Sequence, residues 1–567
     1  MGSIIKDRLT HVVLGLILFM LLIDLPTILN LSYYVNIRKC IVELKFTPLI
    51  SYHVDSIILM ALLLFLLVLT LRSKMKTLMM ILVIVVTTTL FMFINSFLSL
   101  AFIVVSSLLF LFVYVIFERR ILRGAITSLL NLLLVVYVMA LTTYILMIMM
   151  GNNSILQNPI AQLEVKIWGA LGCLNPLFIT LTLYWWIVRP VVRSLQRAKN
   201  SEHNKQKDEQ ISHHVVLNYR IILMLGLVLS VLVMVLPYSP TINPLGIPVA
   251  VDAYYYETWL KEVTEKGVRQ VLIVANGTRP LYMLILYALH KGFNISIREI
   301  AMYHNIPWMP LLTLSVYYLT LKMYKDKKIA AIAALLTPLT PTTLAFIYGG
   351  FQTHHLALVI SYLAIALYTV ENKRKMILAI ILTVILTYIH PWAWISTVAT
   401  ITLVTLYKNI KERKIEIREI IHGKPYKYLT LYLLANFVAY IIKSTITPRT
   451  IVRTAEKLIT LENILKTPLN MLDLSYTYMW TSYNNPVYYL SSAISILHNE
   501  INPIHILAFI VSLLIPFSHY AGAMSRYIMV LPLQVFIAKK FYNRPRVLRT
   551  LIAMQLTFTI RQVINVI

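Results

Sequence analysis

The chain has 567 residues, of which 59% are hydrophobic and only 13% are charged, and its mean hydropathy is +0.75. A water-soluble domain needs roughly twice that share of charge to cover its surface, so the composition excludes a soluble globular protein. The formal charge of +28 comes from 51 basic and 23 acidic residues. The basic residues lie in short stretches between apolar runs, as they do in membrane proteins, and this argues against nucleic-acid binding.

Apolar runs of roughly 18 to 25 residues recur along the chain, which favours membrane-spanning helices over the short alternating strands of a barrel. We therefore predict an all-α polytopic membrane protein with about 16 to 17 transmembrane helices and no soluble domain. The run at 10–31 is too long for a cleavable signal and is predicted to be the first span. Cys40 and Cys173 are far apart and predict neither a disulfide framework nor a thiolate metal site.

The basic clusters are predicted to face the cytoplasm, which orients the spans. Residues 1–192 then form an N-terminal membrane block of about six helices. Its predicted spans are 10–31, 54–72, 77–94, 97–117, 125–150 and 166–188. The polar stretch 193–220 predicts a cytoplasmic linker before a second block, 221–567.

The second block begins with an outward span at 221–236 that Pro237 ends, so the loop 238–302 is predicted to be external. Within this loop, 278–293 is too short to cross the membrane and is predicted to form a surface helix. A second external loop is predicted at 444–486. The other predicted spans are 303–321, 328–345, 355–371, 376–390, 391–407, 428–443, 487–498, 503–518, 526–538 and a tail crossing from Val547.

The stretch from Gly246 to Trp259 follows an apolar run and contains Asp252 directly before three tyrosines. A scarce carboxylate among aromatic rings is a candidate general base, because apolar surroundings raise its affinity for protons. Tyr255 and Trp259 would wall the site and offer ring faces on which a ligand can stack. The alternative is that Asp252 only caps a short helix whose tyrosines anchor it at the membrane surface.

Further candidates lie near the predicted outer boundary. Glu257 is either a second catalytic acid, or a partner of Asp252 in a divalent metal site for Mg or Mn, or a surface glutamate. Arg279 and Arg526 are cations at the edges of apolar segments, where each either holds a phosphate or extends toward water. Four histidines, His304, His354, His355 and His390, either bind a metal ion or a phosphate or are interfacial histidines satisfied by backbone or water; His354 and His390 are the best functional candidates.

The order of motifs in 221–540 resembles the GT-C type of membrane glycosyltransferase, which includes oligosaccharyltransferases, protein mannosyltransferases and lipid A aminoarabinose transferases. The matching residues are Asp252-Ala-Tyr-Tyr-Tyr, Arg279-Pro-Leu-Tyr, Ala330-Ala-Ile-Ala-Ala-Leu-Leu-Thr-Pro338, His390-Pro391 and Ser525-Arg-Tyr-Ile-Met-Val-Leu-Pro532. The resemblance implies transfer of a sugar from a polyprenyl-phosphate or polyprenyl-diphosphate carrier to a protein, lipid or glycan acceptor. It also implies that Asp252 acts as base or metal ligand and that Arg526 holds the carrier phosphate.

The predicted location is the plasma membrane, with the active side external. Two other functions stay open. A transporter or lipid flippase would need paired charges or broken helices within the bilayer, whereas the predicted spans are largely free of buried ions, Asp24 being the main exception. A non-catalytic membrane assembly subunit would keep the fold and use the first block for docking.

Overall fold

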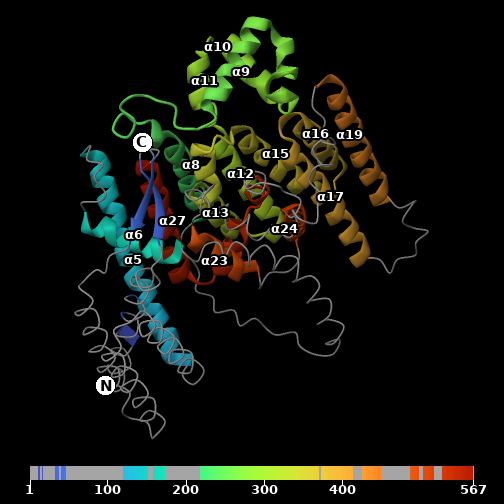
Figure 1. Ribbon diagram of the computed structural model, residues 1–567. Coiled ribbons are helices and arrows are strands. Elements are labelled where there is room, and N and C mark those ends of the chain that lie inside the picture. Colours follow the sequence, from blue (N-terminus) through green and yellow to red (C-terminus); the bar gives the residue numbers. More distant parts are fainter. Residues whose placement is uncertain are drawn as a thin grey trace, which may run out of the picture. The chain divides into compact units, whose positions relative to one another are not determined.

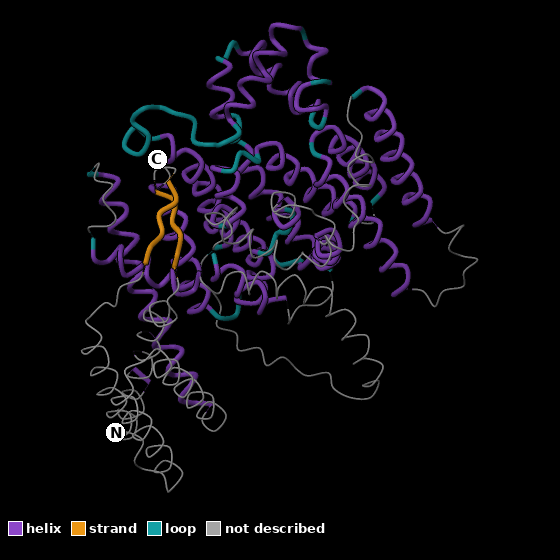
Figure 2. The backbone as a smooth tube through the Cα atoms, viewed as in Figure 1, coloured by secondary structure: helices purple, strands orange, loops and turns teal. Residues whose placement is uncertain are grey.

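The computed structural model describes residues 11–12, 16, 19, 32–37, 40–45, 119–150, 158–172, 218–369, 372–412, 424–447, 485–496, 502–515 and 526–565. These residues are predominantly helical, as predicted (Figures 1 and 2). One two-stranded sheet pairs β1 (Ser32–Ile37) with β2 (Cys40–Lys45) and departs from the all-α prediction. Tyrosine, valine and isoleucine in these strands favour extended backbone.

The chain divides into two compact units. The first contains 1–35, 40–174 and 549–557, and the second contains 36–39, 175–548 and 558–567. The division after residue 174 falls inside the predicted sixth span, and most of the predicted linker 193–220 lies outside the described residues. The predicted domain boundaries therefore stay predictions.

The first unit contains α5 (Arg119–Met149) and α6 (Pro159–Gly172). The tyrosine hydroxyl of Tyr144 on α5 donates a hydrogen bond of 2.8 Å to the fully buried Glu164 on α6. Tyr137 packs edge-on against Trp168 in the same interface. The helix predicted at 125–150 is confirmed, whereas the spans predicted at 54–72, 77–94 and 97–117 lie outside the described residues.

The second unit is a bundle of helices. It contains α8 (Tyr219–Val235), α12 (Trp308–Tyr324), α15 (Gln352–Tyr368), α16 (Lys373–Ile389), α17 (Pro391–Glu412), α19 (Lys424–Ile446), α23 (Pro486–Ile496) and α24 (Pro503–Leu514). The residues of α27 (Pro545–Asn565) are divided between the two units. Each predicted span between 221 and 443, except 328–345, is a single helix within a few residues of its expected bounds. The small residues Gly226 and Ser230 let α8 approach its neighbours, and the Ser230 hydroxyl meets that of Thr313 at 2.6 Å.

Five helical stretches of the described part are long and apolar enough to cross a bilayer. They are Ile126–Met149, Tyr219–Tyr238, Lys327–Tyr348, Tyr428–Ile446 and Pro545–Ile564. These segments agree with a membrane protein. The last of them matches the crossing predicted for the tail, and the full number of about 16 to 17 spans stays a prediction.

Two predicted spans are broken rather than continuous. The segment predicted at 328–345 consists of α13 (Lys327–Leu336), η5 (Thr337–Leu339) and α14 (Pro341–Tyr348). The segment predicted at 526–538 has a helical turn at 526–529 and then α26 (Gln534–Phe541). Proline lacks a backbone donor, and Pro338, Pro341 and Pro532 lie at these breaks. The Gln534 side chain joins them by donating to the Thr337 hydroxyl at 3.4 Å.

Buried charges correct a second expectation. Glu164 and Arg561 are fully buried, and Lys443 is 6% exposed, all within helices. The sequence had suggested that Asp24 was the main charged residue within the spans. The mean hydropathy of a run averages over all faces of a helix, so it does not reveal a single charged residue. Such a residue can lie on the face that packs inside the protein.

The loop predicted to be external is a helical cap (Figure 1). It contains α9 (Ala253–Lys266), η3 (Val268–Leu272), η4 (Val274–Gly277), α10 (Pro280–Phe293) and α11 (Ile297–Tyr303). The helix predicted at 278–293 is confirmed as α10; proline stands at its first position and the left-handed Asn294 ends it. Buried Tyr256 and Leu260 pack with Leu356 and Leu386 of the bundle, so the cap and the bundle share one core.

The orientation of the cap can be tested by labelling. In a Cys40→Ser, Cys173→Ser background, we expect Lys266→Cys to react with a membrane-impermeant maleimide added to intact cells. We expect Lys325→Cys to react only after permeabilisation, because its lysine cluster should stay in the cytoplasm. Labelling of both positions from one side would contradict the predicted topology.

Candidate functional site

Asp252 lies where the chain enters the cap. The backbone N–H of Val251 donates to the carbonyl of Tyr348 at 2.9 Å and holds the entry against the end of α14. Asp252 occupies the position before the first turn of α9, yet its side chain makes no capping hydrogen bond. No hydrogen-bond partner of this carboxylate is found among the described residues. The capping alternative therefore loses its physical basis, and the carboxylate is free to act on a ligand.

A glycine permits this placement. Gly350, in the turn between α14 and α15, has a φ of +71°, which side chains other than hydrogen rarely allow. A Cβ atom at Gly350 would lie 2.2 Å from the Cβ atom of Asp252. Backbone and carboxylate can approach this closely only because residue 350 has no side chain.

Two guanidinium groups act on Asp252. Arg279 donates through Nη1 to the Tyr256 hydroxyl at 2.7 Å and to the Thr353 hydroxyl at 3.2 Å. Arg526 lies over the ring of Phe351, with 5.7 Å from Cζ to the ring centroid. Within the described ranges, neither arginine pairs with a carboxylate as a salt bridge. Both arginines thus lie within electrostatic range of Asp252 in the second unit, and the roles expected of these residues stay predictions.

Burial and these charges oppose one another at Asp252. Burial raises the pKa of the Asp252 carboxyl above its usual value, and the nearby Arg279 and Arg526 partly offset this rise by stabilising the ionised form. A carboxylate with a raised pKa is a stronger base than an exposed aspartate. The two guanidinium groups near Asp252 also favour the binding of an anionic ligand next to them.

Aromatic rings from α9 flank the arginine. Trp259 packs edge-on against Tyr256, and its ring lies 5.3 Å from Cζ of Arg279. Tyr255 stacks on Trp259 with centroids 5.9 Å apart and stays largely exposed. The predicted pair of Tyr255 and Trp259 therefore forms a continuous aromatic surface next to a guanidinium, which suits stacking against a sugar ring.

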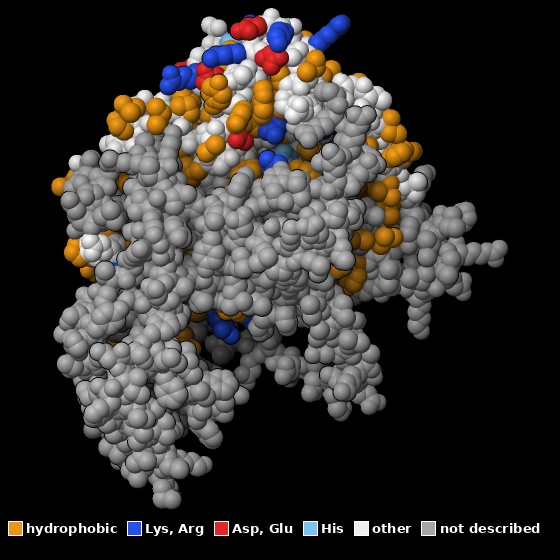
Figure 3. Space-filling view, viewed as in Figure 1, with side chains coloured by type: hydrophobic (Ala, Val, Ile, Leu, Met, Phe, Trp, Pro, Cys, Tyr) orange, Lys and Arg blue, Asp and Glu red, His pale blue; other side chains and the backbone are white. Residues whose placement is uncertain are grey.

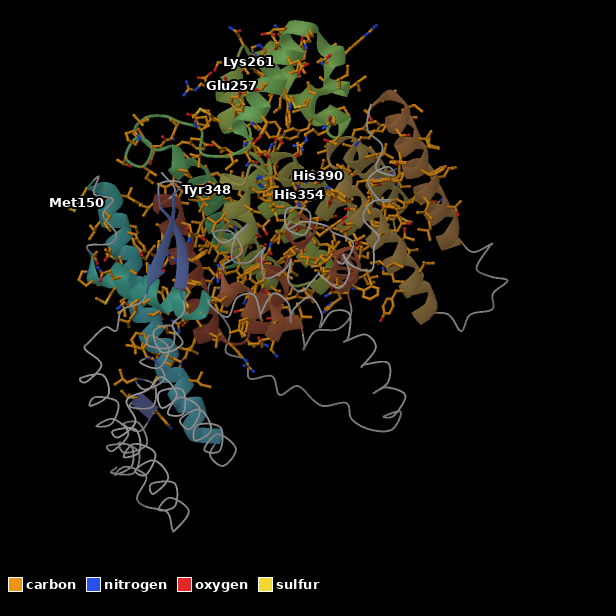
Figure 4. The ribbon with its side chains drawn as sticks, viewed as in Figure 1. Met150, Glu257, Lys261, Tyr348, His354 and His390 are labelled. Atoms are coloured by element: carbon orange, nitrogen blue, oxygen red, sulfur yellow. The ribbon has the colours of Figure 1, made fainter. Side chains whose placement is uncertain are left out.

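Glu257 points to a different partner. Its carboxylate forms a salt bridge of 2.7 Å with Lys261 one turn along α9 (Figure 4). No contact in the described part joins Glu257 to Asp252. Charged side chains gather over this cap in Figure 3, as expected of a solvated surface. The structure thus agrees with the surface alternative, and a catalytic or metal-binding role for Glu257 stays a prediction without a supporting contact.

The four histidines separate into two kinds. His354 and His390 come together, with 3.3 Å between their Nδ1 atoms (Figure 4). His355 instead contacts the Asn305 side chain at 2.6 Å, and His304 packs between Tyr256 and Tyr282. Adjacent positions on a helix point about 100° apart, which explains why His354 and His355 have different partners.

Lys443 was not predicted from the sequence to be part of the site. Its ammonium donates to the carbonyl of Thr387 at 2.7 Å and to that of Thr278 at 2.9 Å, and so ties the residue before Arg279 to the end of α16. The only signal in the sequence was a lysine at the boundary of a predicted span, where such residues usually extend toward water. Gly350 and Thr353 were also missed as parts of the site, because single glycines and threonines are common in membrane helices.

No group of three or more His, Cys, Asp or Glu side chains in the described ranges converges as metal ligands would. The predicted loop 444–486 lies outside those ranges, apart from its first residues and its end. A divalent ion at Asp252 therefore stays a prediction. No model of a known protein family and no curated protein matches the chain, so the resemblance to GT-C glycosyltransferases also stays a prediction.

The contact between Gly350 and Asp252 predicts a stability effect. Gly350→Ala should lower the free energy of unfolding by about 1 to 3 kcal/mol, because the new methyl group clashes with Asp252 and the positive φ is strained. Thermal unfolding in detergent measures the change. Gly292→Ala is the matched control, since a Cβ there meets nothing within 4 Å. Equal melting temperatures for the two variants would contradict the close approach.

Proposed function

We propose that this protein is a membrane glycosyltransferase that uses a sugar linked to a polyprenyl phosphate or polyprenyl diphosphate, at the outer face of the plasma membrane. The observation that supports the proposal most is the unbonded carboxylate of Asp252 within electrostatic range of two arginines that lack carboxylate partners in the described part. Such a set combines a base with an anion-binding position. These are the two chemical functions that transfer from a glycosyl phosphate requires.

Asp252 accepts the proton of the acceptor hydroxyl or amide as the acceptor attacks the anomeric carbon of the sugar. The bond from that carbon to the phosphate oxygen breaks, and the lipid phosphate leaves with the electron pair. Arg279 and Arg526 stabilise the charge that develops on this leaving group. Attack opposite to the leaving group inverts the configuration at the anomeric carbon.

The aromatic surface supports the sugar in this proposal. Tyr255 and Trp259 offer ring faces beside Arg279, and the His354 and His390 pair lies deeper in the bundle within electrostatic range of Arg526. In this scheme the predicted loop 444–486, most of which lies outside the described residues, closes over the acceptor, which is a protein, lipid or glycan. Glu257 takes no step in it, because its partner is Lys261.

A transporter or flippase is the second candidate, and two observations favour it. Helices break at Pro338 to Pro341 and near Pro532, and Lys443 is buried within a candidate span. Broken helices and buried ions are typical of transport proteins. Asp252 lies in the cap rather than in a candidate span, and its carboxylate is unbonded within electrostatic range of Arg279 and Arg526, so the enzyme is the better proposal.

Replacing Asp252 tests the enzyme directly. With purified protein and polyprenyl-linked sugars, Asp252→Asn should reduce the rate of sugar transfer by about 100-fold or more, since it removes the base and keeps the size. Glu265→Gln removes a negative charge from the exposed surface of α9 and is the control. Equal turnover by wild type and Asp252→Asn would remove Asp252 from the mechanism. Sugar uptake into vesicles without transfer would favour the transporter.

The pH dependence provides an independent test. If transfer needs ionised Asp252, the rate is highest above the pKa of Asp252 and is lost as the pH falls through that pKa. Arg279 lowers the pKa of Asp252, so Arg279→Gln should move the acidic limb of the kcat/KM profile to higher pH. Arg269→Gln, on the exposed surface of the cap, should leave the limb in place. A limb that stays fixed in Arg279→Gln would assign it to another group.

A further inference from the structure

The positive charge around Asp252 exceeds what one phosphate diester can balance. Arg279, Arg526 and Lys443 supply three positive charges, and Asp252 supplies one negative charge. The salt bridges of the described part lie elsewhere, on α9. Two positive charges therefore remain without a carboxylate partner among the described residues.

These cations surround one region. Lys443 bonds the carbonyl of Thr278, the residue before Arg279. Arg279 bonds the Thr353 hydroxyl, and Thr353 precedes His354 in α15. His390, in contact with His354, lies within electrostatic range of Arg279, Arg526 and Lys443. Hydrogen bonds thus connect Lys443 to the residue before Arg279, and Arg279 in turn acts electrostatically on Asp252.

Lys443 is suited to bind an anion. An ammonium has three donors, and two of them bind the carbonyls of Thr278 and Thr387. One donor remains on a side chain that is only 6% exposed. A buried cation without a negative partner is unfavourable, and an anionic ligand relieves that cost.

We propose that the donor is a lipid diphosphate sugar, with Arg526 and Arg279 on the phosphoryl group next to Asp252 and Lys443 beside the second phosphoryl group. A monophosphate diester carries one negative charge and a diphosphate diester carries two. The charge of the diphosphate diester therefore balances the two positive charges that have no carboxylate partner among the described residues. The inference rests on the proposed function and selects one of its two donor classes.

Binding measurements on the full-length protein in lipid nanodiscs test the inference. The probes are a sugar linked to polyprenyl monophosphate and the same sugar linked to polyprenyl diphosphate with the same chain, which are the two diesters compared above. Wild type should bind the diphosphate about tenfold or more tightly, because it forms an additional charge-assisted hydrogen bond. Lys443→Met should abolish that preference and leave the monophosphate affinity within about twofold. Lys291→Met, an exposed lysine on α10, is the control for lost charge and should keep the preference.

The outcomes separate the inference from the function. Equal affinities of wild type for the two lipids, or tighter binding of the monophosphate, overturn the diphosphate inference and leave the glycosyltransferase standing. Binding of neither lipid overturns both. If Lys443→Met does not fold, the ratio of affinities measured on wild type decides alone. A preference that survives in a folded Lys443→Met protein removes Lys443 from the second phosphoryl position.

Discussion

The site depends on the close approach of Asp252 to the turn at Gly350. The hydrogen bond from Val251 to Tyr348 holds the first residues of the cap against α14, and the missing side chain at Gly350 leaves room for the carboxylate. The same turn leads into Phe351, whose ring lies under the guanidinium of Arg526. It also leads to Thr353, whose hydroxyl accepts a hydrogen bond from Arg279. One short turn thus determines where the acid and both arginines lie, while the cap core of Tyr256 and Leu260 keeps α9 above it.

Hydropathy and charge predicted much of the helical framework. The runs that became α8, α12, α15 and α16 were continuous and bounded by basic or proline residues, so their bounds could be read within a few residues. The broken segments at Thr337 and Pro532 were not predicted, because an apolar average does not register where a backbone hydrogen bond is lost. The strand pair at 32–45 was also missed, since a short run between predicted spans appeared to be a loop.

The site was predictable where a residue type was rare. Asp252, Arg279 and Arg526 stood out because charges are scarce in apolar surroundings, and both arginines lie within electrostatic range of Asp252. Lys443 and Gly350 did not stand out, since their importance lies in contacts with residues far away in the sequence. For Glu257 the sequence left a catalytic role and a surface position open, and its carboxylate pairs with Lys261 one helical turn away, as a surface glutamate does.

The buried cations also bear on the choice between enzyme and transporter. In a transporter, charges within the bilayer pair with each other or alternate between partners as the conformation changes. Here Lys443 bonds two backbone carbonyls on different elements, Thr278 of the cap and Thr387 of α16, and so fixes the cap on the bundle. Because Lys443 joins the cap to the bundle by hydrogen bonds, the groups around it are held in fixed positions. Rigid placement of charge is what stabilises a developing phosphate anion, since preorganised groups need no rearrangement during the reaction.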